Sequence, residues 1–211
     1  MKTIPRMFAI ALGSLGLVVG AQGQAQATLI PTLDTIAPSG GNFIWSYDIS
    51  LAFDQNATGG SSQSVNPVPL TSGTGDFLTI YDFRGFVGGT CFAPTGWSCQ
   101  TQAIGFTPST QTPADSGLTN LSFTRTGATL DGPIADLGDF GAQSTIGLTT
   151  PGTFTSRGTK NVGMLAGTKV DSIGAVSVPA PVPEPATLLL LGSTITGIGV
   201  LLRRRREKQQ M

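Results

Sequence analysis

The sequence predicts a mainly β protein, in which an antiparallel β-sandwich-like domain lies between an N-terminal signal peptide and one C-terminal transmembrane helix. Three observations support this fold class. Large apolar side chains occupy every second position from Phe43 to Phe53, which is the period of a strand with one buried face. No segment between Thr28 and Val178 sustains the 3.6-residue period of an amphipathic helix. Glycine and proline separate many short apolar runs, as they do in antiparallel sandwiches.

Residues 1–27 have the organisation of a secretory signal peptide. A short basic region opens the chain, and an apolar run from Met7 to Val19 follows it. Ala25 and Ala27 frame a small-x-small cleavage site, so we expect the mature chain to begin at Thr28. An uncleaved anchor helix is the alternative, but the apolar run is short for one. We expect the Sec export machinery to move the chain across the inner membrane.

The part that remains, residues 28–178, suits one β-rich exported domain. Between Thr28 and Val182 five basic and ten acidic side chains give a net charge of −5, although the whole chain is formally neutral. The domain has no basic patch, so we expect no nucleic acid partner.

Several further strands are expected along this domain. Phe77 to Phe83 is apolar on both faces, which is typical of a central strand. The pattern predicts short strands at 102–106, 118–125, 144–148, 152–156 and 161–165, and a last one at 171–178. Loops or irregular segments are predicted at 107–117 and 131–141, where glycine, proline and polar residues dominate.

Cys91 and Cys99 are the only two cysteines. An even number in an exported chain predicts a disulfide between them. Closing so short a loop would stabilise the fold by about 2.5 kcal/mol. Reactive thiols and metal ligation are the alternatives, but zinc is disfavoured because the chain has no histidine and no second cysteine pair.

Catalytic groups are scarce. The chain has no histidine, and its first glutamate is Glu184. No nucleophile, base and orienting group can be assembled, so we expect no enzyme activity and no cofactor. A hydrolase that uses paired aspartates stays open as an alternative. Asp131, Asp136 and Asp139 offer ligands of the type that Ca²⁺ prefers, but their spacing matches no EF-hand loop, and we predict no metal.

A carbohydrate-binding module is a second alternative. Trp45 and Tyr47 share the apolar face of one predicted strand, so we expect them in the core. Trp97 lies inside the predicted disulfide loop and is the aromatic residue that we expect to be available to a sugar.

The C-terminal segment has three parts. A proline-rich stalk at 179–185 contains the motif Val182, Pro183, Glu184 and Pro185, in which the prolines favour an extended chain. Residues 186–202 are uncharged and predict a transmembrane helix of about 25 Å. The tail at 203–211 opens with Arg203, Arg204, Arg205 and Arg206, which should hold it in the cytoplasm.

These three parts together resemble the PEP-CTERM sorting signal of bacteria that carry an exosortase, a tail that is also labelled an ice-binding protein C-terminal domain. The resemblance covers about Val182 to Lys208 and does not extend to the domain before it. It implies a membrane-anchored precursor, recognition by an exosortase-type processing enzyme, and delivery to the cell envelope or extracellular matrix. For the domain itself, the low charge and the missing catalytic groups favour a non-enzymatic structural or adhesive protein, and we consider exopolysaccharide as a further partner.

Overall fold

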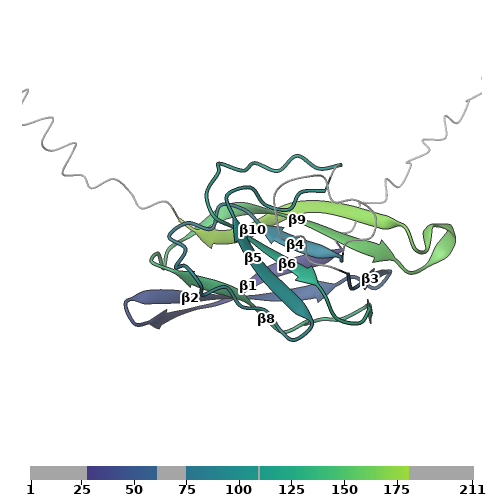
Figure 1. Ribbon diagram of the computed structural model, residues 1–211, viewed down its shortest axis with the longest axis horizontal. Coiled ribbons are helices and arrows are strands. Elements are labelled where there is room, and N and C mark those ends of the chain that lie inside the picture. Colours follow the sequence, from purple (N-terminus) through teal and green to yellow (C-terminus); the bar gives the residue numbers. More distant parts are fainter. Residues whose placement is uncertain (1–27, 61–74, 109, 181–211) are drawn as a thin grey trace, which may run out of the picture.

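The structure is a computed structural model that describes residues 28–60, 75–108 and 110–180. Within these ranges it is built from antiparallel strands, and its only helical element is the 3-10 turn η1 (Gly163–Leu165). Two sheets pack against each other and enclose one apolar core (Figure 1). The mainly β prediction is therefore confirmed. The predicted signal peptide, transmembrane helix and basic tail lie outside the described residues.

The first sheet has three strands in the order β1-β2-β8. The hairpin of β1 (Leu29–Ser39) and β2 (Asn42–Leu51) turns at Gly40 and Gly41, whose φ angles are 58° and 88°. Two consecutive positive φ angles are those of the tight hairpin turn that glycine favours. On its other side β2 pairs with β8 (Asp139–Ser144).

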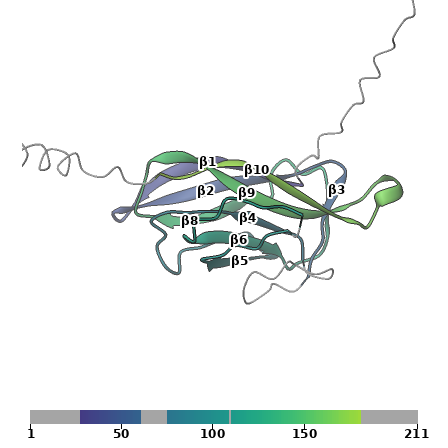
Figure 2. The same ribbon diagram turned by 90° about the horizontal axis from the view of Figure 1, so that it is seen from above.

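The second sheet has seven strands. Their order is β5-β6-β4-β9-β3-β7, and β10 pairs with β9. Figure 2 shows β10, β9, β4, β6 and β5 following one another across this sheet. The bounds are β3 (Gln55–Ala57), β4 (Phe77–Ile80), β5 (Trp97–Gln102), β6 (Asn120–Arg125), β7 (Leu130–Asp131), β9 (Thr149–Lys160) and β10 (Lys169–Pro179).

The core forms where the inner faces of both sheets meet. Trp45, Tyr47 and Ile49 on β2 are fully buried, as their alternation predicted. Their partners from the second sheet lie on β4, β6, β9 and β10 and include Leu78, Ile80, Leu121, Phe123, Phe154, Val176 and Val178. The full burial of this apolar surface is the main force that holds the two sheets together.

Strand β4 is buried on both faces, as a central strand should be. Its inner residues face the core, and Phe77 on its outer face packs edge-on against Phe106 at 6.1 Å between ring centroids. Phe106 belongs to the segment that follows β5, so this loop covers the outer face of the sheet. The strand ends at Ile80, three residues before its predicted end.

Strand β1 was not predicted, because Pro31 and Pro38 interrupt its pattern. It lies at the edge of the first sheet, where a missing N–H group is tolerated. Residues 139–141 were predicted to be irregular but begin β8, since pairing with β2 compensates for a weak local pattern.

The strands predicted at 144–148, 152–156 and 161–165 are wrong in their bounds. Residue 144 ends β8 and residues 145–148 form no strand, whereas 152–156 lie inside the longer strand β9. Pro151 lies near the start of β9, where β10 is its only partner strand among the described residues. Residues 161–165 include η1 and form the tip of the β9–β10 hairpin, which projects beyond the sheets (Figure 1). The strand predicted at 102–106 is also displaced, because β5 ends at Gln102. At the other end, β10 continues to Pro179, which was expected in the stalk.

Candidate functional site

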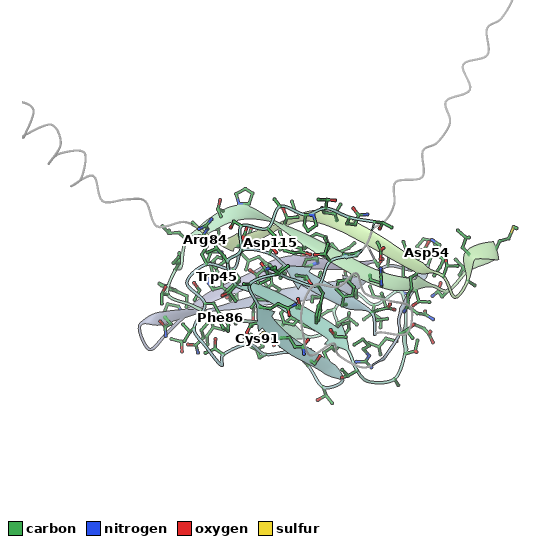
Figure 3. The ribbon with its side chains drawn as sticks, turned by 45° about the horizontal axis from the view of Figure 1, so that its top comes forward. Trp45, Asp54, Arg84, Phe86, Cys91 and Asp115 are labelled. Carbon is green, nitrogen blue, oxygen red and sulfur yellow. A yellow bond between two sulfur atoms is a disulfide. The ribbon has the colours of Figure 1, made fainter. Side chains whose placement is uncertain are left out.

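The Cys91–Cys99 loop contains the predicted disulfide, with a Cα–Cα distance of 6.0 Å (Figure 3). Trp97 inside this loop exposes only 8% of its surface. Its ring packs edge-on against Phe140 at 5.3 Å, and the Arg125 guanidinium lies 5.6 Å from the ring centroid. The structure therefore corrects the expectation that Trp97 is available to a sugar: it is a core residue.

Three aspartates come together on the first sheet. Asp34 on β1, Asp48 on β2 and Asp139 on β8 place carboxylate oxygens within 4.8 Å of one another. Asp48 and Asp139 are cross-strand partners, and the register of β1 shifts at Asp34. Partial desolvation and the charge of neighbouring carboxylates raise the pKa of Asp48.

This cluster differs from the trio considered in the sequence. Asp131 lies on β7 in the second sheet, and Asp136 accepts a hydrogen bond from the backbone N–H of Gly138 at 2.7 Å. Of that trio only Asp139 joins the cluster, which Asp34 and Asp48 complete. The sequence did not connect these residues because they are distant in the chain and meet only through strand pairing.

A pocket of about 260 Å³ lies beside the beginning of β9. Strand β4 and the residue after it follow β9 as far as Thr153, whose carbonyl accepts the N–H of Tyr81 at 3.0 Å. The chain then turns away from the sheet at Asp82, whose φ is 56°. The pocket occupies the space that this divergence leaves, and its lining is Asp82, Arg84, Ala114, Thr150, Pro151, Gly152, Thr153 and Val178.

Asp82 is held in place by three hydrogen bonds. Its N–H donates to Asn120 Oδ1 at 2.7 Å. Its Oδ1 atom accepts from the N–H and the hydroxyl of Ser116, at 3.1 and 2.7 Å. None of the described residues donates to Oδ2. One oxygen of this carboxylate is thus used for anchoring, and the other is available.

Arg84 differs from the other basic residues of the domain. Arg157, Lys160 and Lys169 form ion pairs with Asp171, Asp54 and Asp76, and Arg125 donates to the carbonyl groups of Gly96 and Ala128. The Arg84 guanidinium makes no ion pair or hydrogen bond with the part of the chain that the structure describes. It is half-buried and lies at the end of the molecule where β10 ends (Figure 3).

This pocket was not predicted from the sequence. Asp82 and Arg84 fall at the predicted end of a central strand, where alternating charged and aromatic residues could have indicated a solvent-facing edge. The contribution of β9, β10 and the loop after β5 could not be deduced, because these elements are far apart in the chain.

Fold and sites thus define a β-rich domain with a pocket in which Asp82 and Arg84 have hydrogen-bonding groups without a partner among the described residues. Comparison with protein families adds the destination of the chain: the model of the PEP-CTERM protein-sorting motif matches residues 181–206. This match confirms the resemblance, and it covers the C-terminal segment alone. The motif implies a protein that is exported to the cell envelope and sorted by an exosortase. None of the curated proteins or solved structures matches the chain.

Membrane attachment was also predicted for this segment. In residues 28–60, 75–108 and 110–180 no helix is long and apolar enough to cross a membrane. The predicted transmembrane helix at 186–202 and the basic residues Arg203 to Arg206 lie outside these ranges, as do Ala25 and Ala27 of the predicted signal cleavage site.

Proposed function

We propose that this protein is a non-enzymatic structural or adhesive component of the cell envelope or extracellular matrix. In this proposal a C-terminal helix first tethers it to the membrane, and an exosortase-type enzyme then releases it by cleavage near Glu184. The observation that supports it most directly is the sorting motif at residues 181–206.

The connection between domain and motif suits such processing. Val178 and Pro179 end β10 as buried residues, and the N–H of Ala180 donates to the carbonyl of Leu148 at 2.7 Å. The four Cα–Cα steps from Ala180 to Glu184 span at most about 14 Å when the chain is extended. A processing enzyme would therefore act close to the end of the sandwich where β10 ends, and cleavage there would leave every described strand intact.

The chemistry of the described domain supports a role without catalysis. Asp54 and Asp76 form ion pairs that tie the β9–β10 hairpin to its surroundings, and Asp171 forms one between the two strands of that hairpin. Asp115 accepts hydrogen bonds from Asn120 Nδ2 and from the N–H of Gly117. These carboxylates hold the fold together, and the chain has no histidine to act as a base beside them.

Processing is tested by the intact mass of the protein recovered from cells that export it. We expect most molecules to lack Arg203 to Met211, because cleavage near Glu184 removes them. Replacing Pro183, Glu184 and Pro185 with alanines should leave the full-length chain in the membrane fraction, as should deletion of the exosortase. Replacing the four arginines with lysines keeps the positive charge and serves as the control. A wild-type protein that retains the tail would show that the tail is only an anchor.

The aspartate cluster allows a direct test of the hydrolase and calcium alternatives. Asp48 lies between Asp34 and Asp139, so Asp48→Asn removes the central carboxylate without changing the size of the side chain. We expect calcium to leave the melting temperature of the wild-type protein unchanged. A large increase that Asp48→Asn abolishes, or hydrolysis of a glycan that this change abolishes, would refute the proposed metal-free, non-enzymatic role.

A further inference from the structure

We propose that the pocket lined by Asp82 and Arg84 binds a neutral sugar residue of an exported polysaccharide. This inference rests on the proposed envelope or matrix role and names the class of partner for it. It also replaces the buried Trp97 as the place where a carbohydrate would bind.

The pocket has unsatisfied hydrogen-bonding capacity. A guanidinium offers five N–H donors, and a carboxylate oxygen offers two lone pairs. Arg84 uses none of its donors within the described part of the chain, and Oδ2 of Asp82 accepts from none of it. The two side chains also form no ion pair with each other within 4.0 Å. Each polar group is therefore available to a ligand.

The carboxylate of Asp82 is pre-organised. A φ of 56° is uncommon for a residue other than glycine, although aspartate adopts it more readily than most. Here the contacts with Asn120 and Ser116 maintain it. Such backbone conformations concentrate at sites where a side chain must be presented in one orientation. Because the carboxylate is already fixed, a ligand would not have to order it on binding.

The polar groups of the pocket match the chemistry of a sugar ring. Each hydroxyl both donates and accepts, so two adjacent hydroxyls can donate to Asp82 Oδ2 and accept from Arg84. Thr150 and Thr153 add polar groups to the lining, while Pro151 and Val178 provide apolar surface for the C–H groups of the ring. The volume of about 260 Å³ lies just below the usual range of about 300–1,000 Å³ for ligand pockets and suits one monosaccharide unit.

Charge selects a neutral sugar over an acidic one. The pocket combines one anion and one cation, and the domain around it has a net charge of −5. An anionic ligand would be attracted by Arg84 but repelled by Asp82 and by the field of the domain. Because none of the described residues that line the pocket is aromatic, we expect weak binding of a single unit, strengthened when a polymer engages many copies of the protein.

The experiment measures binding of neutral hexose oligosaccharides to the full-length protein in detergent by saturation-transfer NMR. Glucuronic acid and glycine are measured in parallel as acidic and zwitterionic probes. We expect the neutral oligosaccharides to bind and the other two probes not to compete with them. Absence of neutral-sugar binding at millimolar concentration, or stronger binding of glucuronic acid or glycine, would overturn the inference.

Three variants locate the site. Arg84→Gln removes the charged fork, and Ala114→Trp fills the pocket from an exposed loop position. Asp82→Asn keeps its oxygen toward the Ser116 donors, so its amide nitrogen faces the ligand in place of an acceptor. Each should weaken binding about tenfold or more, as expected for a lost charged hydrogen bond or a blocked pocket.

The matched control is Asp131→Asn, an exposed aspartate on β7 that does not line the pocket. It should bind as the wild type does, and far-UV circular dichroism should show that all four variants are folded. Unchanged binding in Arg84→Gln and Ala114→Trp would refute this site. Intact mass of the same variants reports exosortase processing separately, so failure of the sugar site is distinguishable from failure of the proposed sorting and matrix role.

Discussion

The ion pair between β9 and β10 allows a quantitative test of the fold. Arg157 and Asp171 are cross-strand partners, with Nε–Oδ1 and Nη2–Oδ2 distances of 2.7 and 3.2 Å. Their side chains are only 6% and 9% exposed. We predict that Asp171→Asn strongly destabilises the domain, because it leaves the guanidinium charge buried without its counter-ion.

The magnitude follows from this burial. Removing one partner of a buried pair costs about 3–5 kcal/mol. Asparagine still offers one oxygen to Arg157 or to the hydroxyl of Thr110, which donates to Asp171 Oδ2 at 2.8 Å. We therefore expect a loss of about 3 kcal/mol in the free energy of unfolding, the lower end of that range. Replacing both partners, as Arg157→Met with Asp171→Leu, should cost much less, because no charge then remains buried.

Urea unfolding monitored by tryptophan fluorescence measures these differences. Trp45 and Trp97 are the only tryptophans, and their exposures of 0% and 8% make both sensitive to loss of the core. Asp131→Asn, which removes an exposed carboxylate on β7, is the control and should change stability by less than about 0.5 kcal/mol. A loss below about 1 kcal/mol in Asp171→Asn, or a double variant as unstable as the sum of the single ones, would contradict the reasoning.

Three further predictions address packing, redox state and pH. A Cβ at Gly141 would lie 1.9 Å from the backbone oxygen of Trp45, so the urea assay should find Gly141→Ala already unfolded without urea. A Cβ at Gly88 would meet nothing within 4 Å, so Gly88→Ala should be folded. Reduction of the Cys91–Cys99 disulfide should lower the free energy of unfolding by about 2.5 kcal/mol, and linked peptides should appear in non-reducing mass spectrometry. The hydrogen bond from Lys160 lowers the pKa of Asp54 in the folded protein. The ionised Asp54 carboxylate therefore stabilises the fold above its unfolded-state pKa of about 3.9, and this stabilisation is lost as the pH falls through the lower folded-state pKa. The difference between wild type and Asp54→Asn should therefore shrink below about pH 4, and a constant difference would contradict this assignment.

The sequence alone determined the features that depend on neighbours in the chain. Alternation from Phe43 identified β2, because a strand with one buried face needs only a period of two. The strand ends at Leu51, and Phe53, which the alternation placed on the buried face, is exposed. The run from Phe77 located the central strand β4, because a strand that is buried on both faces has apolar residues at successive positions. The sorting motif at 181–206 was also readable, because a processing enzyme recognises a contiguous segment.

Tertiary structure decided everything that depends on pairing between distant segments. Pro31 and Pro38 argue locally against a strand, yet β1 forms because β2 supplies its hydrogen-bonding partner and the prolines lie at a sheet edge. From the sequence, Trp97 was expected in a loop, but it is buried in the core, since burying a large aromatic surface is more favourable than leaving it in water.

The two polar sites follow the same rule. Asp34, Asp48 and Asp139 meet only because three strands align in one register, and one residue of slippage would send their side chains to opposite faces. The pocket at Asp82 and Arg84 exists because the chain leaves the sheet there while β9 and β10 continue past it. Strand register and chain divergence result from the packing of the whole core, so no local pattern in the sequence can encode them.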